Sequence, residues 1–155
     1  MQIRFAEARD IPGILNLLCQ VGKVHSDLRP DIFRSGARKY GPSQLLDMLK
    51  DPNTPIFVAM EADTMLGYGF CKVKKYDKDP IFTDGTELYV DDICVDEAQR
   101  GKGIGTVIYR EICRYAALRK CDRITLNVWA DNTAALRFYE KLGLKPQRIF
   151  LEQSL

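Results

Sequence analysis

Hydrophobic and polar positions in the first third of the chain predict one strand and two helices. Apolar and polar side chains alternate over residues 2–6, as in a half-buried strand. After Asp10, an expected helix N-cap, apolar residues recur at the spacing of a helix face: Ile11, Ile14, Leu15, Leu18 and Val21. Residues 23–42 are polar, contain proline and glycine, and indicate no regular element. A short helix is predicted over residues 43–50, with Ser43 as its cap.

The middle of the chain predicts strands and one long helix. Apolar runs over residues 56–60 and 65–76 flank a turn and predict a hairpin. A charged loop then leads to a strand over residues 87–95. After a glycine-rich turn, an amphipathic helix is predicted from its apolar face: Ile104, Val107, Ile108, Ile112, Tyr115 and Ala116.

The last third predicts two strands around one helix. Apolar residues alternate within residues 123–129, which favours a strand. Asp131, Asn132 and Thr133 offer caps for a helix with the inner face Ala135, Phe138, Tyr139 and Leu142. Gly143 stands where a left-handed C-terminal residue belongs. Residues 148–152 are apolar enough for a last edge strand.

This order of elements predicts an α/β fold with a mixed sheet flanked by helices. Short turns between the earlier strands favour antiparallel pairing, whereas the strand–helix–strand unit over residues 87–129 favours parallel pairing. The 155 residues suit a single domain, residues 1–155, with its own core.

Composition narrows the classes of function. The chain has 23 Lys and Arg against 21 Asp and Glu, a balance that does not favour binding to nucleic acid or to a membrane surface. No apolar run approaches the ~18 residues of a membrane span, and the N-terminus lacks the layout of a signal peptide, so we expect a cytoplasmic protein. The five cysteines are scattered and His25 is the only histidine, which predicts neither a disulfide framework nor a metal site.

The glycine-rich turn is the strongest chemical signal. Residues 100–105, Arg-Gly-Lys-Gly-Ile-Gly, can wrap consecutive backbone N–H groups around an anion at a helix N-terminus. Lys102 is followed by glycine rather than Ser or Thr, and Thr106 stands where a dinucleotide fingerprint requires glycine. The turn therefore matches neither phosphate-binding motif. A tight turn without any ligand is the alternative interpretation.

Two segments resemble the signatures of the GNAT family of N-acetyltransferases. Residues 100–105 match the pattern Arg/Gln-x-x-Gly-x-Gly/Ala. Residues 132–144 are similar to the pattern Asn-x-x-Ala-x-x-Phe-Tyr-x-Lys-x-Gly-Phe, with Leu144 in place of the last Phe. The resemblance covers most of the chain. It implies the GNAT-like fold, in which two central parallel strands splay apart, and an acetyl-CoA-dependent N-acetyltransferase.

The resemblance also implies where acetyl-CoA binds, with no metal. The pyrophosphate is expected on the N–H groups of the glycine turn, and the pantetheine between the splayed strands. The implied cofactor-binding residues are Ile93, Cys94, Val95, Arg100, Gly101, Lys102, Gly103, Ile104, Gly105 and Asn132.

The implied reaction is direct attack of a primary amine on the thioester in a ternary complex. An alkyl amine with a pKa of about 10 must first lose a proton, and the departing thiolate gains from receiving one. Tyr139 matches the family's usual position for that acid, with a core tyrosine as the alternative. Asp91 or Asp92 is expected as the base, Asp91 first. Neighbouring strand residues point to opposite faces, so only one of them is expected to face the acceptor. Glu87 and a water relay stay open.

The resemblance further implies that the acceptor lies against residues 23–42 and 76–86. Asp77, Asp79 and Asp84 in the second segment either attract a cationic amine or form an ordinary solvated surface. A small-molecule amine is the first expectation. A peptide or protein amine, and a non-catalytic acyl-CoA-binding module, are the alternatives. Relatives often dimerise through C-terminal strands, so the resemblance also allows a homodimer.

Overall fold

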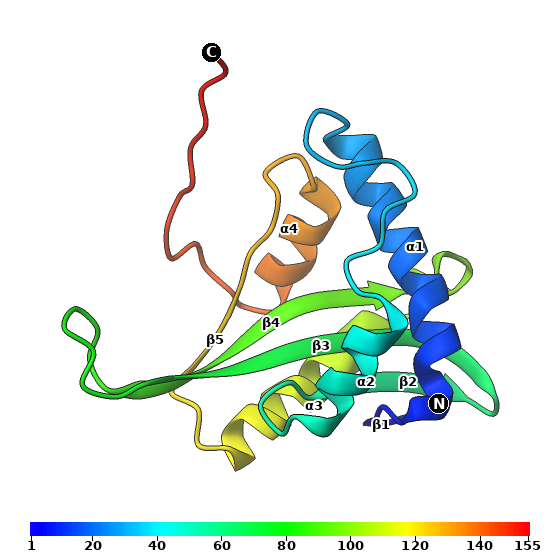
Figure 1. Cartoon of the computed structure of the whole chain (residues 1–155), viewed down its shortest axis with the longest axis horizontal. Helices are drawn as coiled ribbons and strands as arrows, with labels where there is room; N and C mark the ends of the chain where they lie inside the picture. Colours follow the sequence, from blue (N-terminus) through cyan, green and yellow to red (C-terminus); the bar gives the residue numbers. More distant parts are fainter.

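A computed structural model of residues 1–155 has one mixed sheet of five strands in the order β1-β2-β3-β4-β5 (Figure 1). The strands are β1 (Gln2–Phe5), β2 (Ile56–Glu61), β3 (Thr64–Tyr76), β4 (Gly85–Val95) and β5 (Arg123–Leu126). The first four pair antiparallel in succession, and β5 pairs parallel with β4. The predicted mixed sheet and its strand directions are confirmed.

Helices cover both faces of this sheet. They are α1 (Ile11–Leu28), α2 (Pro42–Lys50), α3 (Ile104–Leu118) and α4 (Thr133–Lys141), with short 3-10 turns η1 (Ala8–Asp10) and η2 (Glu97–Gln99). Figure 1 shows α1 and α2 on the near side of the sheet and α3 on the far side. None of the helices combines the length and the apolar composition that a membrane span requires.

Two apolar layers hold the sheet between the helices. The layer under α1 and α2 includes Ile14, Leu17, Leu18, Leu45, Tyr68 and Phe70. The layer under α3 includes Phe57, Leu88, Val90, Ile104, Ile108 and Ile112. Helices α1 and α3 bury most of the stripe that their sequence spacing predicts, and the sheet divides the core into two halves.

Gly67 lets α3 approach the sheet closely. A Cβ on Gly67 would lie 2.7 Å from the carbonyl oxygen of Cys94 and 3.0 Å from Cδ1 of Ile108. Such distances leave no room for a side chain. The N-terminal half of α3 is thereby held against the end of β4, where the glycine-rich turn begins.

The beginnings of the first two helices differ from prediction. Asp10 is at the N-cap position of α1, but its carboxylate accepts both N–H arms of Arg4, at 2.6 and 2.8 Å, instead of capping the helix. Helix α2 is capped by Gly41, not Ser43, and the Gly41 N–H donates to the Gln44 side chain at 2.9 Å. The ion pair with Arg4 explains the change at α1, and Pro42 in the first turn explains the change at α2.

The end of α1 also differs from prediction. The helix continues to Leu28, through residues that showed no apolar pattern. Lys23 and Asp27 pair on its outer side at 2.5 Å. His25 on the same stretch stacks against Phe33 of the following loop, with ring centroids 5.0 Å apart. Tertiary contacts of this kind extend a helix beyond its sequence signal.

Two strand predictions are corrected. The strand expected over residues 123–129 ends at Leu126, because beyond that residue β5 has no pairing with β4. The strand expected over residues 148–152 does not form. Ile149, Phe150 and Leu151 are 82%, 95% and 84% exposed. A strand needs a partner for its main-chain hydrogen bonds, and no strand of the chain pairs with this tail.

Candidate functional site

Strands β4 and β5 separate halfway along β4. They pair from Glu87 opposite Arg123 to Val90 opposite Leu126, and not beyond. At the same point β4 has a bulge: Phe70 pairs with Asp92 and Cys71 with Val90, so Asp91 is the extra residue. The edge of β4 that faces β5 therefore has no strand partner over residues 91–95. Its main-chain groups are available to a ligand lying in the split.

The glycine turn directly continues the split edge of β4. Asp96 caps η2 by accepting the N–H of Ala98 at 2.9 Å. Gln20 of α1 fixes the same turn, because it donates to Asp96 at 3.0 Å and accepts the N–H of Glu97 at 3.0 Å. Gly101 and Gly103 then take φ angles of +78° and +77°. L-residues with side chains rarely adopt this left-handed conformation, so both glycines are required by the path of the chain.

The turn presents unused hydrogen-bond donors. The backbone N–H groups from Arg100 to Thr106 donate to no carbonyl or side chain of the protein, and the next one, of Val107, donates to Gly103 at 3.2 Å. The exposed side chains of Arg100 and Lys102 add positive charge. Consecutive N–H groups at a helix N-terminus form a site for an anion such as a phosphate. The turn therefore has free N–H groups and positive charge of the kind that an anion requires.

Helix α4 closes the other side of the split. Asn132 caps it by accepting the N–H of Ala135 at 3.1 Å. The ring of Phe138 lies where a Cβ on Gly105 would come within 3.2 Å of it, so Gly105 allows α4 to pack against the start of α3. Asn132 is thus the cap among the three candidates, and the predicted left-handed Gly143, at φ +89°, is confirmed.

Tyr139 of α4 has a hydroxyl that makes no hydrogen bond within the protein. No fully buried side-chain oxygen or nitrogen lacks a partner, so this hydroxyl is accessible to solvent. Burial of the ring, with a smaller contribution from the charge of Asp92, raises the pKa of Tyr139 above its ordinary value. The phenol is protonated at neutral pH, and the charge of Asp92 acts on it.

Asp91 is surrounded by donors. Its carboxylate accepts the hydroxyl of Tyr40 at 2.6 Å and the ammonium groups of Lys39 and Lys72 at 2.9 and 3.1 Å. Burial opposes ionisation, but the hydrogen bonds from Tyr40, Lys39 and Lys72 hold the pKa of Asp91 below its usual value. Asp91 is thus a firmly ionised carboxylate whose oxygens are already occupied.

Asp92 has the opposite environment. Its only hydrogen-bond partner is the buried hydroxyl of Tyr68, at 2.7 Å. Burial raises the pKa of Asp92 above the usual value for a carboxyl group, and Tyr68, Lys39 and His25 offset the rise only in part. A carboxylate with a raised pKa and few partners is the better proton acceptor.

The bulge places both carboxylates on one side of the sheet. Tyr68, the partner of Asp92, and Tyr40, the partner of Asp91, both pack in the layer under α1 and α2. The expectation that neighbouring strand residues point to opposite faces is therefore wrong at this position, because the extra residue breaks the alternation.

An aromatic row borders the same region. His25 stacks on Phe33, and Phe33 meets Trp129 edge to face with centroids 5.1 Å apart. Arg29 lies over the Trp129 ring at 5.7 Å. Burial lowers the pKa of His25, with the charge of Asp92 opposing the shift, so its imidazole is neutral at pH 7. The row joins the loop after α1 to the segment after β5.

Sequence reasoning placed the segment 23–42 against the acceptor without a role for Lys39 or Tyr40 in it, and it missed Lys72 and Trp129. Lys39, Tyr40, Lys72 and the aromatic row carry no motif and come from segments far apart in the chain. The presence of the only tryptophan and of a tyrosine–lysine pair in an unassigned loop is a weak signal at best. Only folding brings Tyr40 and Lys72 to one carboxylate.

The remaining predicted acids lie elsewhere. Glu87 is at the closed end of the split, where it accepts Thr125 at 2.6 Å, Arg123 at 3.2 Å and Lys74 at 3.4 Å. Burial works against ionisation, yet these donors lower the pKa of Glu87. Asp79 and Asp84 accept backbone N–H groups of their own loop. The loop over residues 76–86 thus uses two of its three acids to fold itself.

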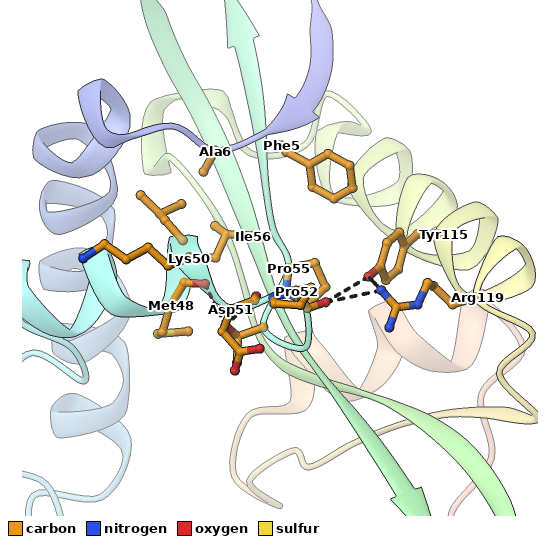
Figure 2. A pocket seen from close by; sticks show the side chains of 12 residues that line it. Phe5, Ala6, Met48, Lys50, Asp51, Pro52, Pro55, Ile56, Tyr115 and Arg119 are labelled. Atoms are coloured by element: carbon orange, nitrogen blue, oxygen red, sulfur yellow. Dashed lines mark hydrogen bonds between the residues drawn. The ribbon is translucent and has the colours of Figure 1, made fainter.

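Two surface cavities lie outside the split. One, of about 390 Å³, is at the far end of α3 from the glycine turn, between Phe5, Pro52 and Tyr115. Figure 2 shows Tyr115 and Arg119 both reaching the carbonyl of Pro52 across this cavity. The other, of about 440 Å³, lies between α1 and η2 beside Arg100. No group of three or more His, Cys, Asp or Glu side chains is arranged to hold a metal ion.

Comparison with solved structures gives a close match. The crystal structure of a tetramutant of the BH1408 protein from Bacillus halodurans superposes on this chain with a TM-score of 0.95. The two chains are 31% identical, and the match covers 100% of each. The arrangement of strands and helices described above is therefore shared with that protein over its whole length.

Comparison with sequences identifies relatives of known class. The spermine/spermidine N(1)-acetyltransferase of Bacillus subtilis (strain 168) is 31% identical over 72 residues, which are 46% of this chain and 45% of that protein. The N-alpha-acetyltransferase 30 of Xenopus laevis is 32% identical over 95 residues, which are 61% of this chain and 33% of that protein. The match thus spans less than half the length of each relative.

A family model supplies the wider view. The acetyltransferase (GNAT) family matches residues 23–144. This range includes the split strands, the glycine turn and α4. The chain therefore belongs to the GNAT family of acetyltransferases.

Proposed function

We propose that this protein transfers the acetyl group of acetyl-CoA to a primary amine of a small molecule. The observation that carries the proposal is the continuity of the split edge of β4, which starts at the bulge beside Asp92, with the turn of unused N–H groups. The charge of Asp92 also acts on Tyr139 of α4. A cosubstrate with a phosphorylated end and an extended arm fits such a path.

The chain offers a separate contact for each part of acetyl-CoA. The N–H groups from Arg100 to Thr106 would hold the pyrophosphate, including those of Gly101, Lys102, Gly103, Ile104 and Gly105. The exposed Arg100 and Lys102 add charge. The main chain of Ile93, Cys94 and Val95 would hold the arm, and Asn132 would border it at the start of α4. When bound there, acetyl-CoA supplies the activated acyl group.

Asp92 is the base that the geometry favours. Its raised pKa and single partner suit it to accept a proton from the attacking amine, directly or through a water. Asp91 is the weaker candidate, because Tyr40, Lys39 and Lys72 already occupy its carboxylate oxygens. Its role in this proposal is to hold the loop after α1 against the bulge.

Tyr139 is the acid in this proposal. Its phenol is protonated at neutral pH, has no partner in the protein and is affected by the charge of Asp92. It can therefore donate a proton to the departing sulfur while Asp92 receives one from the amine. The two groups have environments suited to opposite directions of proton transfer.

The test separates binding from chemistry. With acetyl-CoA and a panel of amines, mass spectrometry should detect the gain of one acetyl group. Tyr139→Phe should lower kcat by about 100-fold, the usual scale for losing a general acid, and leave the Kd for CoA unchanged. Unchanged kcat would remove Tyr139 from the mechanism. Saturable CoA binding without any acetylated product would favour a non-catalytic acyl-CoA-binding module.

A glycine pair tests the anion site. Gly103→Ala should weaken CoA binding at least tenfold, because it forces an L-residue into a left-handed φ within the turn. Gly36→Ala is the matched control: Gly36 has φ +72° and, like Gly103, no atom within 4 Å of an added Cβ. Equal CoA affinity in both variants would contradict the assignment of the turn.

We also propose that the C-terminal tail completes a strand against a second copy of the chain. Ile149, Phe150 and Leu151 are almost fully exposed, and the outer edge of β5 has no strand partner. Main-chain hydrogen bonds between copies would give the tail a strand to pair with and would give the edge of β5 a partner. Sedimentation should then show a homodimer that Phe150→Asp dissociates. A wild-type monomer at high protein concentration would refute this arrangement.

A further inference from the structure

A row of cationic side chains borders the proposed amine site. Lys39, Lys72, Lys74 and Arg123 lie on the face of the sheet that α1 and α2 only partly cover, and we call them the cationic strip. Lys39 and Lys72 share the carboxylate of Asp91. Lys74 and Arg123 share that of Glu87. Lys39 lies in the loop before α2, and Lys72 and Lys74 lie on β3, which extends to the left beyond α1 and α2 in Figure 1.

The two carboxylates, of Asp91 and Glu87, lie inside, and the cations of the cationic strip lie outside. The side chains of Asp91 and Glu87 are only 6% and 9% exposed, whereas those of the strip are 38% to 43% exposed. Both carboxyl groups have lowered pKa values and are ionised. Four positive charges therefore face solvent over two buried negative ones. The surface that a ligand meets is positive.

The strip begins next to the proposed base. Asp91, which binds Lys39 and Lys72, is the direct neighbour of Asp92 in β4. The charge of Lys39 is among those that stabilise ionised Asp92. Glu87 lies four residues before Asp91 in β4, or about 13 Å away at the usual rise per residue. An amine held at Asp92 thus has Lys39 and Lys72 beside it and the second cluster further along.

This arrangement discriminates between kinds of amine. A diamine placed with one amine at Asp92 would bring its second positive charge toward Lys39 and Lys72. An amine with an anionic group would instead bring a negative charge to those half-exposed ammonium groups. Of the three acids in the loop over residues 76–86, Asp79 and Asp84 bind the backbone of their own loop, which leaves Asp77 as the one without such a bond.

We infer that the acceptor is a small amine that also carries an anionic group, a carboxylate or a phosphate, which Lys39 and Lys72 bind. This inference rests on the proposed acetyltransferase function, since it assumes that the amine lies at Asp92. It names the class of acceptor that the site selects and assigns specificity to two lysines outside the sequence motifs.

Matched substrates test the inference. 4-Aminobutyrate and 1,4-diaminobutane have the same four-carbon chain and differ in one charged end. O-phosphoethanolamine and ethanolamine form the corresponding phosphate pair. With acetyl-CoA and the full chain, we expect kcat/KM to be at least tenfold higher for the anionic member of at least one pair, and the more effective pair identifies the anion. The preference should shrink as ionic strength rises.

Variants of the lysines test the assignment. Lys39→Gln and Lys72→Gln should each raise KM for the preferred anionic amine at least fivefold with little change in kcat, and should improve kcat/KM for the diamine. Lys72→Arg keeps the charge and should retain most of the preference. Lys50→Gln is the control, because Lys50 is an exposed lysine paired with Asp47 on α2. A thermal melt of each variant checks that it is folded.

The outcomes distinguish the inference from the function beneath it. Acetylation that favours the diamine, or a preference that Lys39→Gln and Lys72→Gln do not alter, overturns the inference and leaves the acetyltransferase intact. If no amine is acetylated, calorimetry measures whether the anionic amines bind to the complex of the protein with CoA. Lysine-dependent binding of 4-aminobutyrate or O-phosphoethanolamine supports the inference although the proposed function fails. Absence of such binding overturns both.

Discussion

Asp91 and Asp92 are chemically identical neighbours with opposite ionisation behaviour. Asp91 accepts Tyr40, Lys39 and Lys72, and its pKa is lowered. Asp92 has Tyr68 alone, and burial raises its pKa. The difference comes from the surroundings and not from the residue type. One carboxylate is thereby held as a fixed charge, and the other stays free to exchange a proton.

The raised pKa of Asp92 predicts that Asp92→Asn stabilises the protein at pH 7. A group whose pKa is higher in the folded state favours folding while it is protonated, and that stability is lost as the pH rises through the folded value. Each unit by which the pKa is raised corresponds to about 1.4 kcal/mol. Urea unfolding at pH 7 should therefore give a higher midpoint for Asp92→Asn than for wild type, together with a large loss of turnover.

Asp91→Asn is the matched control for that experiment. Here the folded pKa is lowered, so the ionised carboxylate stabilises the protein above its unfolded pKa. Its replacement leaves Lys39 and Lys72 without their shared partner and should lower the urea midpoint. Destabilisation by both variants would contradict the contrast between the two sites.

At the scale of elements, the places where strand pairing is interrupted shape the candidate site more than the regular parts of the strands do. The bulge at Asp91 and the end of β5 at Leu126 fall at the same level of the sheet. Together they turn a continuous sheet into a split one and move two carboxylates to one face. The helices then fix the opening, α3 through the glycine turn and α4 through the contact of Phe138 with Gly105.

Two glycines in β3 should differ in their tolerance of a methyl group. A Cβ on Gly67 would meet a backbone oxygen at 2.7 Å, whereas a Cβ on Gly69 would meet side-chain methyl groups, Cδ1 of Ile112 at 2.9 Å and Cγ2 of Ile108 at 3.0 Å. We expect Gly69→Ala to cost about 1 kcal/mol and Gly67→Ala about 3 kcal/mol, the two ends of the usual range for overpacking. Urea unfolding of both variants measures the difference.

Gly67→Ala should also disturb CoA binding, because it displaces the end of β4 that leads into the glycine turn. Gly69 is further from that turn along β3. Equal midpoints for the two variants would show that the backbone near Cys94 moves more easily than the packing indicates.

At the scale of the whole molecule, ionised carboxylates connect elements that are distant in sequence. Asp10 joins β1 to the start of α1 through Arg4. Glu87 joins three strands through Lys74, Arg123 and Thr125. Asp91 joins the sheet to the loop before α2. All three carboxyl groups have lowered pKa values, led for Asp10 by its bond with Arg4 and for the others by donors that outweigh burial.

These links predict acid-induced loosening. Carboxyl groups with lowered folded pKa values contribute stability above their unfolded values, near pH 4, and lose it as the pH falls through the folded values. The free energy of unfolding should therefore decline steadily below about pH 4. Asp10→Asn should cost about 2 kcal/mol at pH 7, as expected for hydrogen bonds to a charged group, and less at pH 3. Guanidinium titrations at both pH values provide the measurement.

A cost that is equal at both pH values would mean that Asp10 acts through packing alone. Sodium chloride offers a second check. The contribution of Asp10, whose side chain is 4% exposed, should be less sensitive to salt than that of the exposed pair of Lys23 and Asp27.

Residues close together in the sequence are enough to predict the order of the elements, the glycine turn and the faces of the helices. Apolar spacing predicts α3 and α4, and the position of Gly143 after α4 predicts its left-handed conformation, because these features depend on neighbours a few residues away. The two signatures predict the family. The regions of the candidate site that contain Tyr139 and residues 100–105 are therefore recognisable in the sequence alone.

Other features depend on contacts between distant segments, which form only in the folded chain. The end of β5 depends on β4, the length of α1 depends on Phe33, and the unpaired tail depends on the absence of a neighbouring strand. The choice of Asp92 over Asp91 depends on donors from residues 39, 40, 68 and 72. Partners so far apart in the chain leave no periodic trace in the sequence, and a bulge reverses the alternation on which a local prediction relies.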